Sequence, residues 1–171
     1  MKLKGDNFII RNYVLEDIHS LAENANNSKI WINLRDGFPH PYSIEDAEKF
    51  ISVVNLLDPV TNYAIDVNKI CVGAIGFEFG KNVFRKTAEV GYWLGEGYWG
   101  RGIMTKAVSL FTDFMFENFD IERIQASVFD WNIASAKVLE KAGFTFEARL
   151  KKHVLKNDMF GDELIYARFR E

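Results

Sequence analysis

The 171-residue sequence has one cysteine, three prolines and no long hydrophobic run, and these shortages exclude several classes of protein. Because Cys71 is alone, no disulfide can form within the chain, which favours a reducing compartment. No apolar stretch approaches the roughly 20 residues that a membrane-spanning helix needs, and the first residues lack the pattern of a signal peptide. We therefore expect a cytoplasmic protein without a membrane partner.

The chain also lacks an excess of charge of one sign. Its 21 basic and 24 acidic residues give a net charge of -3 at pH 7, so no strong field attracts nucleic acid, and we expect no nucleic-acid partner. The three histidines are scattered, and no spacing of His, Cys and Asp is typical of a metal site, so no metal is predicted. Cys71 lies in an apolar stretch without a basic neighbour, which favours a core residue over a nucleophile.

Hydrophobic residues make up 48% of the chain and aromatic residues 15%, which is enough for one core. No repeat, linker or low-complexity segment is found, so residues 1–171 are predicted to form a single domain. Apolar periodicity predicts the order strand, two helices, three strands, helix, strand, helix, two strands. Since helices join parallel strands and short turns join antiparallel ones, we expect an α/β (α+β) fold with a mixed, mostly antiparallel sheet of six or seven strands and about four helices.

Residues 95–105, "GEGYWGRGIMT", place four glycines before an apolar segment of helical period. A glycine turn at a helix start directs backbone N–H groups and the positive end of the helix dipole to one place, which predicts an anion site. A Walker P-loop is excluded because Ile103 and Met104 follow Gly102 instead of Lys and Ser or Thr. A dinucleotide-binding fold is disfavoured because the loop follows an antiparallel meander. The remaining alternative is a tight turn without a ligand.

Two motifs decide between these interpretations: "AEVGYWLGEGYWGRGIMTKAV" (88–108) and, further along the chain, "NIASAKVLEKAGF" (132–144). With both, nearly the whole chain resembles the GNAT superfamily of acyl-CoA-dependent N-acetyltransferases, and within it the RimJ/RimL-type branch. The resemblance implies a sheet splayed in the middle, between the "GYWL" and "IQASV" strands, and acetyl-CoA as the donor.

The resemblance also implies where acetyl-CoA binds. The pantetheine arm would pair with the backbone of the "GYWL" strand, and the pyrophosphate would lie on the N–H groups of residues 99–104. In family members Asn132 contacts the cofactor and Ser135 lies near the thioester sulfur. The implied cofactor-binding residues are Tyr92, Trp93, Leu94, Trp99, Gly100, Arg101, Gly102, Ile103, Met104, Asn132 and Ser135.

The sequence departs from the family pattern at two positions. Gly97 stands where the wider family has Gln or Arg, which removes a side-chain contact but leaves the main-chain ones. Leu139 stands where many members have a tyrosine that acts as the general acid, and Ser135 is the nearest substitute. This vacancy raises a second hypothesis, a catalytically weak acyl-CoA-binding or sensing domain on the same fold.

Direct transfer of acetyl to an amine needs a base, an oxyanion contact and a proton for the thiolate. Glu89 is the candidate base because it interrupts the apolar alternation of its strand; the alternatives are a carboxylate that faces solvent or pairs with Lys86 or Arg85, and Glu78 as the base. The backbone N–H of Leu94 is the candidate oxyanion contact. Ser135 is either the proton donor or, beside Asn132, part of a helix start.

The segment "WINLRDGFPHPY" (31–42) is expected to border the acceptor. Trp31, Arg35, Phe38 and Tyr42 are the predicted pocket residues; alternatively, the aromatic ones fill the gap between helices and sheet. The expected acceptor is a primary amine on a peptide or a small molecule. A protein N-terminus is the least demanding choice because its pKa, near 8, leaves part of it neutral at pH 7. We expect a monomer or homodimer.

Overall fold

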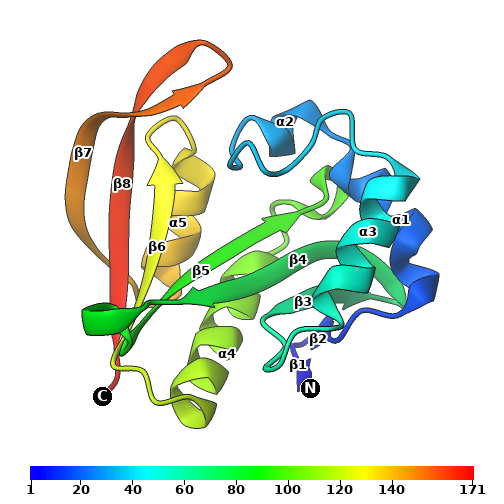
Figure 1. Ribbon diagram of the computed structural model, residues 1–171, viewed down its shortest axis with the longest axis horizontal. Coiled ribbons are helices and arrows are strands. Elements are labelled where there is room, and N and C mark those ends of the chain that lie inside the picture. The colour runs from blue at the N-terminus through cyan, green and yellow to red at the C-terminus, as the bar shows by residue number, and fades with distance from the viewer. The chain divides into compact units, whose positions relative to one another are not determined.

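A computed structural model describes all of residues 1–171, with five α-helices and eight β-strands. Hydrogen bonds order the strands β1-β2-β3-β4-β5-β6-β8-β7 (Figure 1). β5 pairs with β6 in parallel, whereas β1–β2, β2–β3, β3–β4, β6–β8 and β7–β8 are antiparallel. The predicted mixed, mostly antiparallel sheet is therefore confirmed.

The chain divides into two compact units, and each is described by itself. Unit 1 consists of Met1–Gly76 and Tyr92–Ala107, and unit 2 consists of Phe77–Gly91 and Val108–Glu171. The boundary runs through β4, β5 and α4, so these elements contribute to both units. That residues 1–171 form one domain stays a prediction.

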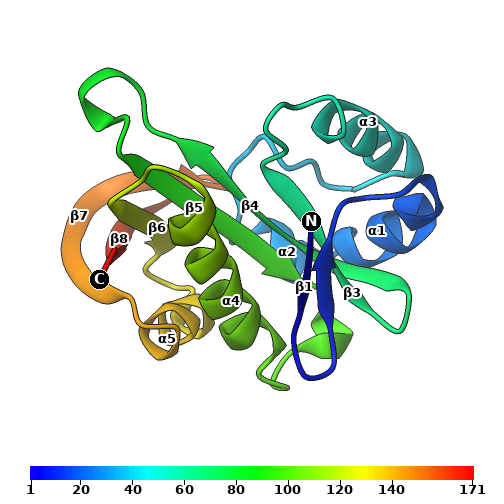
Figure 2. The ribbon, with the colours of Figure 1, turned by 90° about the horizontal axis from the view of Figure 1, so that it is seen from below.

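Unit 1 combines the N-terminal helices with one end of the sheet. Its elements are β1 (Lys2–Lys4), β2 (Ile9–Arg11), η1 (Leu15–Asp17), α1 (Ile18–Ala25), α2 (Ser28–Trp31), α3 (Ile44–Val54), β3 (Asn62–Val67), most of β4 (Ile70–Phe79), the end of β5 (Thr87–Leu94), η3 (Glu96–Tyr98) and the first turn of α4 (Ile103–Asn118). The β1–β2 hairpin runs beside β3 (Figure 2). No helix of the structure is both long and apolar enough to span a membrane.

The apolar faces of α1 and α3 build the core of unit 1. Leu21, Ala22 and Ala25 of α1 and Ala47 and Ile51 of α3 recur at helical spacing and are buried in one cluster. α3 begins as the sequence predicts, because the Ser43 hydroxyl accepts from the N–H of Asp46 at 3.1 Å. These helices thereby hold the loop between α1 and α3, which carries the predicted acceptor residues.

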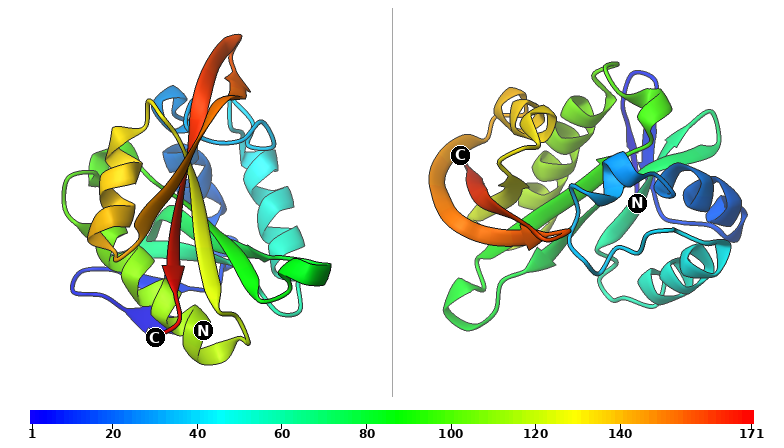
Figure 3. Two further views of the ribbon diagram at one scale, coloured as in Figure 1. Left: turned by 90° about the vertical axis from the view of Figure 1, so that its left-hand side faces the viewer. Right: turned by 90° about the horizontal axis from the view of Figure 1, so that it is seen from above.

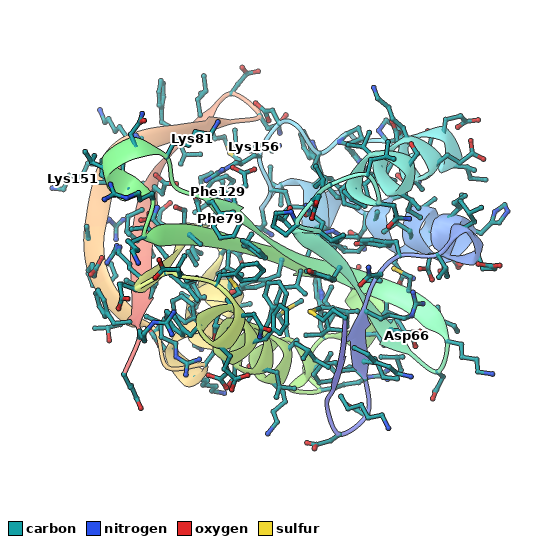
Figure 4. All side chains as sticks on the ribbon, turned by 60° about the horizontal axis from the view of Figure 1, so that its bottom comes forward. Asp66, Phe79, Lys81, Phe129, Lys151 and Lys156 are labelled. Carbon is teal, nitrogen blue, oxygen red and sulfur yellow. The ribbon has the colours of Figure 1, made fainter.

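A buried ion network ties β2, η1 and β3 together. The Arg11 guanidinium donates two hydrogen bonds of 2.7 Å to Asp17 and one of 2.7 Å to Asp66, which Figure 4 labels. The hydrogen bonds to Asp17 raise the pKa of Arg11 most, so the guanidinium stays charged. Since both carboxylates are buried, removal of Arg11 would leave them without their counter-charge.

One strand and one α-helix of unit 1 have no counterpart in the sequence prediction. β1 is only three residues long, too short for period-two alternation to reveal it, and it adds the eighth strand. α2 is only four residues long and begins at Asn27, whose side-chain oxygen accepts from the N–H of Lys29 at 2.8 Å. A helix of one turn is marginal by itself, so α2 depends on its cap and on the packing of buried Ile30.

Unit 2 contains a long antiparallel hairpin and two helices. Its elements are the end of β4, η2 (Asn82–Phe84), the start of β5, the remainder of α4, β6 (Arg123–Phe129), α5 (Ile133–Lys141), β7 (Thr145–Lys156) and β8 (Met159–Phe169). β8 lies between β6 and β7, and the β7–β8 hairpin twists strongly along its length (Figure 3).

An aromatic cluster forms part of the core of unit 2. Phe77 lies 6.0 Å from Phe111 of α4 and 5.1 Å from Phe119, measured between ring centroids. Lys81 and Lys151 lie at the periphery of this unit (Figure 4) and are exposed, whereas Lys156 at the end of β7 is buried.

Candidate active site

The glycine loop of unit 1, residues 95–102, follows β5 and leads into α4. Gly100 and Gly102 both have φ of +73°, which L side chains rarely adopt. A Cβ at either position would meet no atom within 4 Å. These glycines are therefore required by the backbone conformation and not by packing, and they leave the outer surface of the loop open.

Backbone bonds hold the glycine loop in place. The N–H of Gly95 donates to the carbonyl of Val72 on β4 at 2.7 Å, and the N–H of Tyr98 donates back to the carbonyl of Gly95 at 2.9 Å. The Arg101 guanidinium donates to the carbonyl of Gly97 at 2.7 Å and lies 5.4 Å from the centre of the Tyr98 ring. Arg101 is thus folded over its own loop, where its charge adds to the positive potential of the helix start.

The first turn of α4 is the predicted pyrophosphate site. The first intrahelical bond runs from the N–H of Lys106 to the carbonyl of Gly102 at 3.1 Å, so the N–H groups of residues 103–105 have no partner within the helix. Ile103 and Met104 bury their side chains, which are 2% and 8% exposed. These two predicted cofactor residues can therefore contribute only backbone groups.

The end of β5 carries the predicted contacts to pantetheine and the oxyanion. A Cβ at Gly73 of β4 would lie 2.4 Å from the carbonyl oxygen of Trp93, so the two strands approach closely here. The indole N–H of Trp99 donates to the carbonyl of Leu94 at 2.6 Å. That carbonyl is thus occupied from within the loop, and the N–H of Leu94 is the part of the residue that the oxyanion prediction uses.

The predicted acceptor residues occupy different environments. Phe38 and Tyr42 lie 4.9 Å apart and pack on the core cluster of unit 1, and Phe38 also lies 5.8 Å from Trp93. Trp31 is half-buried and stacks on His40 at 5.4 Å, whereas Arg35 is exposed. For Phe38 and Tyr42 this packing agrees with the gap-filling alternative, and their role in a pocket stays a prediction.

In unit 2 the parallel strands β5 and β6 separate, as the sequence analysis expected. Their pairing covers only Thr87–Arg123, Ala88–Ile124 and Glu89–Gln125. Beyond Gln125, β6 continues to Phe129 and stays paired with β8. The separation of the two strands therefore begins at the candidate base.

Glu89 is half-buried on the face of β5 opposite to Ala88 and Val90, which are both buried. Lys86, one of the suggested partners of Glu89, forms an ion pair with Asp120. Glu78, the alternative base, is exposed on β4. The greater burial of Glu89 and its place at the last β5–β6 pair thus favour Glu89 over Glu78 as the candidate base.

The start of α5, in unit 2, is the other place where the sequence predicts a cofactor contact. The side-chain oxygen of Asn132 accepts from the N–H of Ser135 at 3.2 Å, so Asn132 caps the helix. Its amide NH₂ group is not used in this cap. Leu139, at the position where the family resemblance implies a tyrosine, is 0% exposed and belongs to the core.

Cys71 cannot supply the nucleophile of a covalent mechanism. The thiol is fully buried on β4, and burial raises its pKa to about 12. A thiol that stays protonated and inaccessible is a core residue, as predicted.

Comparison with known proteins identifies the family. A family profile described as "Acetyltransferase (GNAT) domain" matches residues 7–145. The chain belongs to the GNAT acetyltransferase family. It is an acetyl-CoA-dependent N-acetyltransferase, and acetyl-CoA is the donor that the predicted residues would hold.

Individual relatives agree with the RimJ/RimL-type branch of the GNAT family. The chain is 28% identical over 165 residues to a ribosomal-protein-serine acetyltransferase of Escherichia coli, which covers 89% of this chain and 91% of that one. It is 42% identical over 82 residues to a probable N-acetyltransferase, YjcK, of Bacillus subtilis, which covers 48% of this chain and 45% of that one. The structure of RimL, a ribosomal L7/L12 alpha-N-protein acetyltransferase in complex with coenzyme A, matches with a TM-score of 0.85 at 23% identity, over 99% of this chain and 98% of that one.

Sequence reasoning missed two contacts that position the glycine loop. One is the bond from Trp99 to Leu94, and the other is the ion pair between Lys29 of α2 and Glu96 of η3, which Asn27 reinforces with a hydrogen bond of 2.8 Å. No local sequence pattern predicts either contact. The bond from Trp99 depends on the fold of the loop, and the contacts of Glu96 come from residues nearly 70 positions away in the chain.

Proposed function

We propose that this GNAT enzyme acetylates the N-terminal amine of a peptide or protein by direct attack on acetyl-CoA. The observation that carries the proposal is the end of β5–β6 pairing at Glu89. Beyond that pair the backbone of β5 has no β6 partner, which suits the binding of a pantetheine arm as an added strand. The proposed base thus lies on the same strand, three residues before Tyr92, where the proposed donor backbone site begins.

In the proposed reaction the amine nitrogen attacks the thioester carbonyl carbon. Glu89 accepts a proton from the amine, directly or through water, and the N–H of Leu94 stabilises the oxyanion. The C–S bond then breaks, the amide forms, and the thiolate takes a proton from the Ser135 hydroxyl or from solvent.

Two considerations support an N-terminal amine as the acceptor. A peptide N-terminus has a pKa near 8, so roughly a tenth of it is neutral at pH 7, whereas lysine is neutral about once in two thousand molecules. The Escherichia coli relative is named for a ribosomal-protein-serine acceptor, which supports a protein substrate. Trp31 at the end of α2 and Arg35 in the segment between α2 and α3 are the residues that we propose border this acceptor.

An amine panel tests the proposal. Acetyl-CoA is mixed with the enzyme and either a serine-start peptide, the same peptide with a blocked N-terminus and an internal lysine, or spermidine. Release of CoA is followed with a thiol reagent, which buried Cys71 does not disturb, and the product is located by mass spectrometry. We expect the highest kcat/KM with the free N-terminus; preferential use of the blocked lysine peptide or spermidine would contradict the proposal.

The role of Glu89 has a separate test. Glu89→Gln keeps the size of the side chain but cannot accept the proton, so kcat is expected to fall about a hundredfold, within the usual range for a lost general base. The affinity for CoA, measured by calorimetry, should stay within twofold. An unchanged kcat would remove Glu89 from the mechanism.

The second candidate function is acyl-CoA binding without efficient transfer. Fully buried Leu139 favours it, since no tyrosine hydroxyl is available at that position to protonate the thiolate. Tight CoA binding without thiol release above the spontaneous rate, for every amine tested, would support this function.

We also infer that the protein is cytoplasmic and that it is a monomer or a homodimer. Sedimentation of the purified chain would test the oligomeric state.

A further inference from the structure

Four glycines lie within the strands, and three of them are required by close packing. A Cβ at Gly73 would lie 2.4 Å from the Trp93 carbonyl oxygen, one at Gly76 2.4 Å from Asn62, and one at Gly161 2.1 Å from the Trp131 ring. Real Cβ atoms essentially never come so close to other atoms. Any side chain at these positions would force the neighbouring atoms to move.

Gly91 on β5 has no such requirement. A Cβ at this position would meet no atom within 4 Å, its φ is not positive, and the residue is exposed. Glycine weakens a strand because it loses more backbone entropy on folding than any other residue. Glycine at position 91 therefore lowers the stability of the strand, although neither packing nor backbone conformation requires a glycine there.

The location of Gly91 suggests what the glycine serves. It lies two residues beyond Glu89, so period-two alternation puts both residues on the same face of β5. It also lies beyond the last β5–β6 pair, where β5 has lost its parallel neighbour. Residues in an open strand that lack a side chain are typical of places where another molecule approaches the backbone.

We propose that Gly91 is a specificity-determining residue: its missing side chain leaves room for the amine-bearing chain of the acceptor to lie against β5 beside Glu89. This inference rests on the proposed function, since it takes Glu89 as the base. The base must contact the acceptor nitrogen, whereas the proposed backbone contacts to the donor come from residues 92–94 and 99–104. A substituent at position 91 should therefore obstruct the acceptor more than the donor.

The test compares Gly91→Ala and Gly91→Val with the wild-type enzyme, using the serine-start peptide and acetyl-CoA. We expect kcat/KM for the peptide to fall about tenfold with Ala and about a hundredfold with Val, the range by which one or a few methyl groups alter discrimination in a tight site. The affinity for CoA should change less than twofold. The melting temperature should be equal or higher, because a Cβ at this position meets no atom within 4 Å and both residues have less backbone freedom than glycine in the unfolded chain.

Thr87→Val is the matched control. Thr87 lies on the same face of β5, two residues to the other side of Glu89, and the substitution perturbs the strand without adding volume. The Thr87 hydroxyl donates a hydrogen bond of 2.8 Å to the carbonyl of Phe84, which lies in the adjacent turn. Peptide kcat/KM should stay within twofold of wild type.

Three outcomes separate this inference from the proposed function. An active wild-type enzyme with unchanged peptide kcat/KM in Gly91→Val would overturn the inference and leave the proposed function intact. A loss of CoA affinity equal to the loss of peptide kcat/KM would also overturn it, because Gly91 would then serve the donor. A wild-type enzyme that acetylates no amine would instead overturn the proposed function.

Discussion

α4 and α5 each follow a strand in the chain, but they differ in how the backbone N–H groups at their starts are satisfied. α5 begins after Asn132, whose side chain accepts from the N–H of Ser135 at 3.2 Å. α4 begins after Gly102, which has no side chain to offer, and the N–H groups of residues 103–105 have no partner within the helix. The start of α5 in unit 2 thus has a side-chain cap, whereas the start of α4 in unit 1 has N–H groups that we propose an anion completes.

The largest expected effect comes from closing the open helix start. Gly100→Asn keeps the positive φ of +73°, which asparagine tolerates, but places a side chain on the open surface of the loop. Loss of one hydrogen bond to a charged pyrophosphate costs about 1.5–3 kcal/mol, so CoA affinity measured by calorimetry should fall about 10- to 100-fold. Gly100→Val, which adds backbone strain, should bind CoA still more weakly.

Gly143→Asn is the matched control for Gly100→Asn. Gly143 also has a positive φ, of +89°, and it ends α5 in unit 2. The substitution therefore places the same new side chain on a left-handed backbone that is not part of the glycine loop. CoA affinity within twofold of wild type is expected for Gly143→Asn; equal affinity in Gly100→Asn would disprove a pyrophosphate site in the loop.

The second prediction asks whether Asn132 does more than cap α5. Asn132→Ala should lower the free energy of unfolding by about 1 kcal/mol, the usual value of a lost N-cap. If the spare amide NH₂ also contacts the cofactor, CoA affinity should fall about tenfold with it. Asn132→Ser, which caps but lacks the amide, should restore stability in urea unfolding and leave the affinity low; recovery of both would mean a purely structural residue.

The third prediction concerns the rigidity of the open loop. Trp99→Phe retains an aromatic ring but removes the 2.6 Å bond from the indole N–H to the carbonyl of Leu94. A neutral hydrogen bond contributes about 0.5–1.5 kcal/mol, so a loop that must be ordered on binding should lose about two- to tenfold in CoA affinity. An unchanged affinity in calorimetry would show that the loop is held by its backbone bonds alone.

The two helix starts also show how much of the structure the sequence predicts. Gly100 and Gly102 before α4 and Asn132 before α5 could be recognised because a few neighbouring residues determine a helix start. The separation of β5 from β6 was expected from the family resemblance. The bond from Trp99 to Leu94, the edge-on contact of Phe38 with Trp93 and the open space beside Gly91 could not be predicted in this way. Each depends on where strands and side chains lie in three dimensions, and alternation along a strand does not reveal whether a glycine faces a neighbour, as Gly73 does, or an open surface.

The smallest expected effect comes from a third helix start, that of α2, which combines both behaviours. The side-chain oxygen of Asn27 caps Lys29, while its NH₂ group donates to Glu96 of η3 at 2.8 Å, just before the glycine loop. The hydrogen bonds from Lys29 and then from Asn27 hold the pKa of Glu96 below its ordinary value. A carboxylate whose pKa is lowered in the folded state stabilises the fold at any pH above its ordinary pKa. This stabilisation is lost only as the pH falls through the lowered pKa, so the contact with Glu96 should be intact throughout the neutral range.

Asn27→Asp tests this contact, since aspartate still caps α2 but repels Glu96 instead of donating to it, whereas Asn27→Ser caps without repulsion. The charges are exposed and screened by salt, so CoA affinity at pH 7 should fall less than about threefold in Asn27→Asp and recover near 0.5 M salt. Asn27→Ser should lie between Asn27→Asp and wild type. An equal loss in both variants, independent of salt, would mean that α2 positions the glycine loop through its cap rather than through Glu96.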